Sequence, residues 1–148
     1  MEERFRTFTV LITKISRSIR RIKTGEMDEF DLKSPHVSVL YYLFKMGAMP
    51  AKELCDICKE DKAAMSRSIK ELESNGLIAC DSNANKRYNS ALNLTEMGVN
   101  IAKQIADKID NILDMASYGL SDEKRAVLYE GLELISKNLE KFCEEKYE

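Results

Sequence analysis

The spacing of apolar residues changes twice along this chain of 148 residues, and these changes limit the folds that it can adopt. As far as Asn75-Gly76 the apolar side chains recur three or four residues apart, which is the period of an amphipathic helix. From Leu77 to Leu94 the period is two residues, which is the period of a β-strand. Helical spacing returns from Thr95 onward. The pattern therefore predicts a mainly α protein with one small β-hairpin between helices.

The first helix is long and carries a single apolar stripe on one side. The stripe consists of Phe5, Phe8, Ile12, Ile15, Ile19 and Ile22. The helix is expected to end near Gly25. A second, very apolar helix is expected to begin at Ser34-Pro35, with the serine as N-cap and the proline at the first helical position, and to end at Gly47.

Two more helices follow, joined by a tight connection. Pro50 opens a short helix that reaches about Ile57, and Asp61 is the expected N-cap of the next helix. One side of that helix is expected in the core because its apolar residues lie at positions i, i+4 and i+7. These residues are Met65, Ile69 and Leu72. Asn75-Gly76 is expected to end the helix with a left-handed residue.

The hairpin is expected from a strand over Leu77–Cys80 and a returning strand between Tyr88 and Leu94, with a polar turn between them. After it, Thr95 and Ser121 each cap a long helix. A short helix, a tight turn, a second helix and a β-hairpin, in that order, predict a winged helix-turn-helix.

Charge is distributed unevenly along the chain. The net charge is −2, so composition alone gives no hint of a nucleic-acid partner. Residues 1–23 carry seven Lys and Arg against two acids, whereas residues 96–148 carry seven against twelve. No apolar run reaches the ~18–20 residues of a membrane span, and the charged N-terminus does not fit a secretory signal. We therefore expect a soluble, cytoplasmic protein without a membrane partner.

The exposed face of the helix after Asp61 combines cations with small residues. It consists of Lys62, Ala63, Ser66, Arg67 and Lys70. The major groove of B-DNA is about 12 Å wide and admits one helix, and large side chains on the facing surface would hold that helix away from the bases. Ala63 and Ser66 permit the approach, while Arg67 can bind a guanine or a phosphate and the lysines suit phosphates. The face predicts binding to double-stranded DNA, although taken alone it also fits an ordinary solvated surface.

Lys86 and Arg87 lie at the expected tip of the hairpin. A cation on a thin loop can enter the minor groove, which is about 6 Å wide and has an enhanced negative potential in A·T-rich tracts. We expect Arg87 in that groove and Lys86 on the phosphate backbone. In the alternative interpretation the two are ordinary loop residues.

In the order of its elements and in its residues, the chain resembles the MarR (multiple antibiotic resistance regulator) family of bacterial transcription factors. The matching stretches are LKSPHVSVLYYL, AKELCDICKEDKAAMSRSIKELESNGLI, NKRYNSALNLTEMG and GLSDEKRAVLYEGLELI, which together span roughly residues 32–135. The resemblance implies a homodimer on pseudo-palindromic DNA, usually a repressor that a small phenolic ligand, a metal or oxidation releases.

The wing departs from the family pattern in two ways. The family commonly has Asp-x-Arg, whereas this chain has Asn85-Lys86-Arg87, and an asparagine cannot form an ion pair with the arginine. The interval from Arg87 to Leu94-Thr95 is also about one residue longer than the commonest form. Lys86 is therefore an alternative to Arg87 for the arginine's usual place.

We expect one domain over residues 1–148. Within it, residues 32–95 form the winged helix-turn-helix lobe, and residues 1–25 and 96–148 form a helical dimerisation region. The apolar stripes on the first and the last two helices leave more apolar surface than one chain can cover, so two intertwined subunits are predicted. Residues 61–74 of each subunit then enter a major groove, with half-sites about one helical turn, roughly 34 Å, apart.

Three residues are candidates for an effector pocket between the dimerisation helices and the DNA-binding lobe. They are His36, Tyr41 and Arg17. His36 lies in the first turn of its helix and is a structural or capping residue in the alternative interpretation. Tyr41 equally fits the core. Arg17 lies on the basic face of the first helix. In the alternative interpretations this face contacts the acidic C-terminal helices of a partner subunit, or it contacts DNA.

The four cysteines are expected to be thiols in a reducing cytosol. Cys55 and Cys58 form a C-x-x-C pair, but the chain has no second pair and one histidine, which is too few for four zinc ligands. We therefore expect no metal and no other cofactor. Cys55, Cys58 and Cys80 are either small apolar fillers or redox-sensing thiols, and Cys80 follows the recognition helix so closely that its oxidation would disturb the wing.

Two other functions compete with DNA binding. A winged helix can bind protein instead of DNA, but Arg67 and Lys70 argue against that function. An enzyme with a cysteine nucleophile needs a nearby base and an oxyanion donor. The chain has one histidine to act as a base and no glycine-rich elbow to provide the donor, so an enzyme is not favoured. We predict that the chain is not an enzyme but a sequence-specific DNA-binding transcriptional regulator, a homodimeric repressor that responds to a small ligand or to thiol oxidation.

Overall fold

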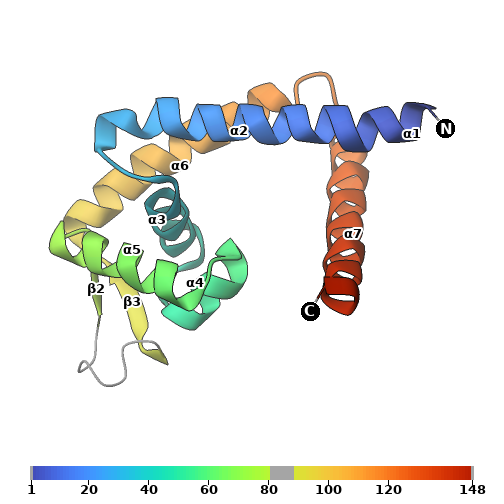
Figure 1. The fold of residues 1–148 in the computed structure, drawn as a ribbon. Helices are drawn as coiled ribbons and strands as arrows, with labels where there is room; N and C mark the ends of the chain where they lie inside the picture. Colours follow the sequence, from blue (N-terminus) through green and yellow to red (C-terminus); the bar gives the residue numbers. More distant parts are fainter. Residues whose placement is uncertain (1, 81–88, 148) are drawn as a thin grey trace. The chain divides into compact units, whose positions relative to one another are not determined.

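Helices make up most of the chain, as the spacing of apolar residues predicts (Figure 1). The structure, a computed structural model, describes residues 2–80 and 89–147. It divides into two compact units, Met1–Ile109 and Asp110–Glu148, with the boundary inside α6. The first unit contains the sheet and the helix-turn-helix, and the second contains α7.

The first helix runs without a break from Glu2 to Met27. It consists of α1 (Glu2–Arg6), the π-helical turn η1 (Thr7–Leu11) and α2 (Ile12–Met27). The helix ends near Gly25, as expected, two residues beyond it at Met27, whose side chain is buried in the core. A short 3-10 helix, η2 (Asp28–Phe30), follows. The π-helical turn was not predicted from the sequence.

The helix α3 (Ser34–Met46) lies at the centre of the first unit and contacts α2, α4, α5 and β3. Val39 and Leu40 are completely buried, as its apolar composition predicts. The expected N-cap at Ser34 is wrong by one residue, because the N-cap is Lys33. The backbone N–H of Lys33 donates to Nδ1 of His36 at 3.2 Å, so a histidine within the helix supplies the capping acceptor.

The helix-turn-helix consists of α4 (Ala51–Cys58) and α5 (Lys62–Ser74). Lys59, with a left-handed φ of 54°, makes the tight connection between them. Asp61 is the N-cap of α5, as predicted, and its Oδ1 accepts a hydrogen bond of 2.7 Å from the backbone of Ala64. Gly76, with φ of 73°, lies just beyond the end of the helix, which confirms the expected left-handed residue.

Asp61→Ala is expected to lower the free energy of unfolding by about 1 kcal/mol, because the N–H of Ala64 loses its acceptor. Urea denaturation monitored by circular dichroism measures the change. Asp61→Asn is the matched control, since asparagine caps a helix about as well as aspartate. An equal loss in both variants would show that the carboxylate contributes through its charge and not as a cap.

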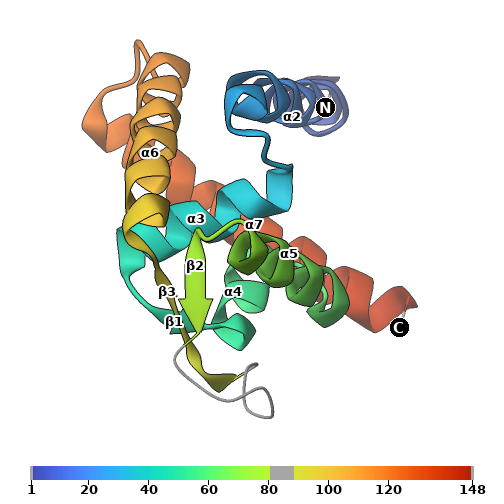
Figure 2. The same ribbon diagram turned by 90° about the vertical axis from the view of Figure 1, so that its left-hand side faces the viewer.

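The sheet is antiparallel and has three strands, in the order β1-β3-β2. They are β1 (Met49–Pro50), β2 (Ile78–Cys80) and β3 (Ala91–Leu94). Ile78 pairs with Leu94, and Cys80 and Met49 pair with Leu92 from opposite sides. The expected hairpin is therefore present, but β1 was not predicted, because two residues ending in a proline carry no period. Figure 2 shows β2 beside α5.

The returning strand is shorter than expected. Within the described residues β3 begins at Ala91, so Ser90 precedes the strand. Tyr88 and the polar turn before it lie outside the described residues.

The helix α6 (Glu96–Ala116) is attached to the turn that follows α5. The hydroxyl of Thr95 donates to the carbonyl of Gly76 at 2.5 Å and accepts from the N–H of Gly98 at 3.0 Å. The N–H of Thr95 also donates to the carbonyl of Leu77 at 3.1 Å. Thr95 thus caps α6, as predicted, and joins it to the turn that follows α5.

The second unit contains α7 (Asp122–Tyr147). Ser121 caps this helix, as predicted, because its hydroxyl accepts from the N–H of Lys124 at 3.3 Å. None of its residues is buried, and Leu128, Leu132 and Leu139 of the expected stripe are exposed. Among the described helices, none combines the length and the apolar content that crossing a membrane requires.

Candidate nucleic-acid interface

The helix α5 has a buried side and an exposed side. Met65, Ile69 and Leu72 fix it in the core, with exposed fractions of 1%, 9% and 0%. All five residues of α5 that the sequence assigned to DNA contact are exposed. We call this set the recognition face: Lys62, Ala63, Ser66, Arg67 and Lys70. The core contacts of α5 therefore turn the whole predicted set toward solvent.

The recognition face can approach a flat or grooved partner closely. Ala63 and Ser66 are its small members, and Arg67 follows Ser66 directly, so a guanidinium stands beside the point of closest approach. Within the described part of the chain, neither Arg67 nor Lys70 forms an ion pair. Their charges are thus available for an anionic partner, and the geometry fits the backbone and base edges of a DNA major groove.

The wing residues Asn85, Lys86 and Arg87 lie outside the described residues. Their expected contacts with the minor groove therefore stay predictions.

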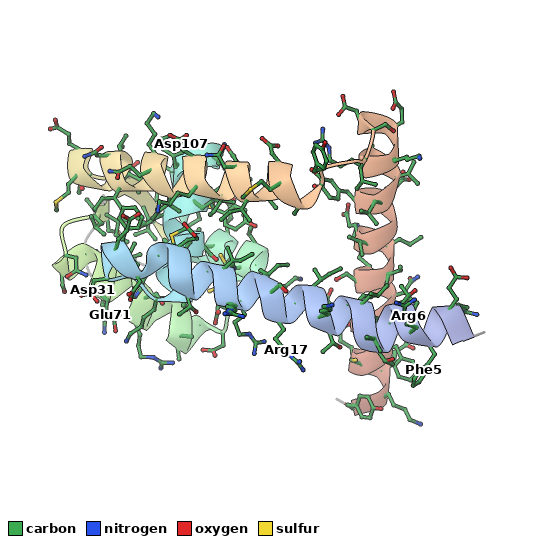
Figure 3. All side chains as sticks on the ribbon, turned by 90° about the horizontal axis from the view of Figure 1, so that it is seen from above. Phe5, Arg6, Arg17, Asp31, Glu71 and Asp107 are labelled. Atoms are coloured by element: carbon green, nitrogen blue, oxygen red, sulfur yellow. The ribbon has the colours of Figure 1, made fainter. Side chains whose placement is uncertain are left out.

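A pocket of about 560 Å³ lies between the start of α3 and the C-terminal half of α5. Its lining is mostly polar and includes residues of η2, α3 and α5. The lining residues are Asp28, Asp31, Leu32, Lys33, His36, Lys70, Glu71, Ser74 and Asn75. In Figure 3, Asp31 and Glu71 lie close together at this place.

Of the three effector-pocket candidates, His36 lines this pocket, whereas Tyr41 and Arg17 do not. Tyr41 is half-buried and packs edge-on against Tyr42, with ring centroids 5.5 Å apart. Arg17 is exposed and lies on α2, well away from the labelled pocket residues (Figure 3). Glu71 contacts His36 across the pocket. It was not predicted as a site residue, because a single sequence contains no signal that pairs these two residues.

The predicted redox cysteines are partly or fully buried. Cys55 is buried and Cys80 is half-buried, and both pack in or against the core. Burial, with smaller contributions from Glu60 and Cys55, raises the pKa of the Cys58 thiol to about 11. Because the thiolate is the reactive form, Cys58 is a poor sensor. Within residues 2–80 and 89–147, no three His, Cys, Asp or Glu side chains gather as a set of metal ligands.

At pH 8, iodoacetamide is expected to alkylate Cys58 at least about tenfold more slowly than an exposed thiol, because about a thousandth of it is ionised and the greater nucleophilicity of its thiolate offsets only part of that loss. Exposed Cys143 is the internal reference. Mass spectrometry of timed samples gives both rates. Raising the pH from 9 toward 11 should increase the rate at Cys58 steeply. Equal rates at Cys58 and Cys143 at pH 8 would contradict the raised pKa.

Comparison with known proteins finds relatives in sequence and in fold, although no family model matches the chain. The chain is 26% identical to an uncharacterized HTH-type transcriptional regulator, YfiV of Bacillus subtilis (strain 168), over 91% of its own length and 84% of that protein. A MarR family regulator from Neisseria meningitidis has the same fold, with a TM-score of 0.81 and 22% identity over 96% of this chain and 97% of the other.

A further similar structure comes from Listeria monocytogenes and is described as a MarR family transcriptional regulator complexed with a 26mer DNA. It has a TM-score of 0.78 and 27% identity over 92% of both chains. The chain thus resembles MarR family regulators in both fold and sequence. The resemblance of the four matching stretches is thereby confirmed, and so is the expected winged helix-turn-helix fold.

Proposed function

We propose that this protein is a member of the MarR family and a sequence-specific DNA-binding transcriptional regulator that binds a pseudo-palindromic operator as a homodimer. The observation that carries the proposal is the recognition face of α5, where Arg67 and Lys70, which form no ion pair with another described residue, lie beside the small residues Ala63 and Ser66. In the operator complex α5 enters the major groove and Arg67 contacts a base edge or a phosphate. The similar Listeria protein was solved with a 26mer DNA, which supports this role.

The homodimer is supported by apolar side chains that the single chain leaves in solvent. On the first helix Phe5, Ile15 and Ile19 are 71%, 58% and 51% exposed. On α7 Leu139 and Phe142 are each 55% exposed. A second copy that covers these stripes removes them from water, which is favourable in proportion to their apolar area. In the proposal residues 1–25 and 96–148 form this dimerisation region and residues 32–95 form the DNA-binding lobe.

The protein acts as a cytoplasmic repressor in this proposal, and a small ligand is the more suitable signal than a thiol reaction. The pocket beside His36 is lined by residues of the recognition helix itself, so an occupant can favour one orientation of α5 over another. The raised pKa of Cys58 and the burial of Cys55 make a sensor at these two cysteines unfavourable. Cys80 remains the thiol candidate because it ends the strand that leads into the wing.

Fluorescence anisotropy against labelled DNA from the region upstream of the protein's own gene tests the proposal across a salt series. We expect tight binding whose logarithm falls linearly with the logarithm of salt concentration, with a slope of about −0.9 for each phosphate contact. A shuffled DNA of the same length is the control and should bind far more weakly. No binding at low salt by a folded dimer would favour the alternative, a winged helix that binds protein.

The oligomeric state is tested separately by sedimentation. Wild type is expected to sediment as a dimer, and the chain truncated after Gly119, which lacks α7, is expected to sediment as a monomer. A stable dimer of the truncated chain would remove α7 from the dimerisation region.

A further inference from the structure

A buried histidine joins α3 to the recognition helix. Nε2 of His36 lies 2.8 Å from Oε2 of Glu71, and Nδ1 of the same ring accepts the N–H of Lys33 at 3.2 Å. The imidazole is 6% exposed, whereas the carboxylate of Glu71 is 49% exposed. The ring thus has both nitrogens engaged, one with the start of α3 and the other with α5.

The two contacts select one form of the ring. Because Nδ1 accepts a hydrogen bond from a backbone N–H, the proton of the neutral imidazole is on Nε2, where it donates to the carboxylate of Glu71. The neutral ring therefore satisfies both partners at once.

Glu71 lies at a sensitive place on α5. It follows Arg67 by four residues, which is about one helical turn, and it is adjacent to Lys70. Its neighbour Leu72 is fully buried, so Glu71 marks the edge between the core side of α5 and the recognition face. A contact held at Glu71 can therefore oppose rotation of the recognition face about the helix axis.

Met65, Ile69 and Leu72 decide which side of α5 is buried, because they are packed in the core. The hydrogen bond between His36 and Glu71 adds a directional contact to this packing. A hydrogen bond weakens steeply when its angle changes, so the contact between His36 and Glu71 restricts rotation more than its modest strength suggests.

We propose that His36 is a positioning residue for operator binding, whose hydrogen bond to Glu71 holds α5 at the rotation in which Arg67 faces the bases. The proposal rests on the proposed function, since it concerns the same recognition face. In this proposal His36 of α3 acts on the recognition helix even when no ligand is bound. If His36 only lined an effector pocket, its substitution would leave the affinity of the ligand-free protein for DNA unchanged.

The sign of the effect at Glu71 separates positioning from simple electrostatics. Glu71 is a negative charge on a helix that meets phosphates, so its removal should strengthen DNA binding if its charge alone mattered. Positioning requires the opposite, because α5 then loses the contact that sets its rotation.

Four variants divide the contact into its parts. Glu71→Ala removes the acceptor, and Glu71→Gln keeps an acceptor without the charge. His36→Asn keeps an acceptor near the position of Nδ1 but does not reach Glu71, whereas His36→Gln carries a donor as far as Nε2. We expect Glu71→Ala and His36→Asn to weaken operator binding about tenfold at fixed salt, and both glutamine variants to stay within about threefold of wild type.

Glu53→Ala is the control for charge, because it removes an exposed carboxylate from α4, the other helix of the helix-turn-helix. It should bind as tightly as wild type or more tightly. Tighter or unchanged binding by Glu71→Ala would overturn the proposal. Equal weakening by the alanine and glutamine variants would also overturn it, because the hydrogen bond would then not be the cause.

Hydrogen exchange of residues 62–74 in DNA-free protein supplies the second measurement. Faster exchange in Glu71→Ala and His36→Asn, restored in the two glutamine variants, is expected. Unchanged exchange in all four would overturn the proposal even if affinity changed. If wild type bound no DNA but the exchange pattern appeared, the proposed function would fail while the positioning of α5 by His36 would stand.

Discussion

Arg67→Ala is expected to weaken specific operator binding by about 1–3 kcal/mol, which raises the Kd roughly 5- to 150-fold. Arg67 is exposed on α5, follows Ser66 at the point of closest approach, and forms no ion pair within the described residues. Its loss therefore removes a contact to DNA without breaking an ion pair among the described residues. Anisotropy titrations of wild type and variant at one salt concentration measure the difference, and circular dichroism confirms that the fold is intact.

Arg67→Lys is the matched control, and it distinguishes a base contact from a phosphate contact. Lysine keeps the positive charge but lacks the planar fork that binds a guanine through two hydrogen bonds. If Arg67 contacts a base, Arg67→Lys loses specific binding and keeps the binding to shuffled DNA. If both variants bind the operator as wild type does, Arg67 has no role in recognition and the assignment of the recognition face is wrong.

The ends of the elements could be predicted from the sequence where one residue determines them. Asp61 and Thr95 begin α5 and α6 because their side chains accept from the backbone three residues later. Gly76 lies just beyond α5 because its φ of 73° suits glycine. The recognition face could be predicted for a related reason, since Met65, Ile69 and Leu72 fix which side of the helix is buried.

Features that depend on distant contacts could not be predicted. The strand β1 forms because Met49 and Pro50 meet β3, more than forty residues later in the chain. The cap at Lys33 depends on His36, whose other nitrogen meets Glu71 on another helix. A single sequence contains no signal for either pairing, and hydrophobic period describes only residues close in the chain.

The attachment of α6 to the lobe requires a glycine. A Cβ at residue 98 would lie 1.9 Å from the carbonyl oxygen of Leu77 and 2.9 Å from its carbonyl carbon. This close approach lets Thr95 bond to Gly76 and to Leu77, so the stretch Leu94–Gly98 joins α6 to the end of α5. Gly98, the last residue of the matching stretch NKRYNSALNLTEMG, is therefore needed because Leu77 packs directly against its Cα.

Gly98→Ala is expected to lower the free energy of unfolding by about 3 kcal/mol or more, because the added methyl group meets backbone and not a movable side chain. In a chain of this length each kcal/mol corresponds to about 2–4 °C, so the midpoint of thermal unfolding should fall by about 6–12 °C. Thermal and urea denaturation at one fixed protein concentration measure the loss, since dissociation of a dimer makes both depend on concentration.

Gly25→Ala is the matched control, because Gly25 lies within α2 and a Cβ there would meet nothing within 4 Å. The same substitution should then raise the free energy of unfolding, by up to about 1 kcal/mol, since alanine favours a helix over glycine. The two variants are thus expected to change stability in opposite directions. A Gly98→Ala protein as stable as wild type would mean that α6 does not approach Leu77 as closely as the structure places it.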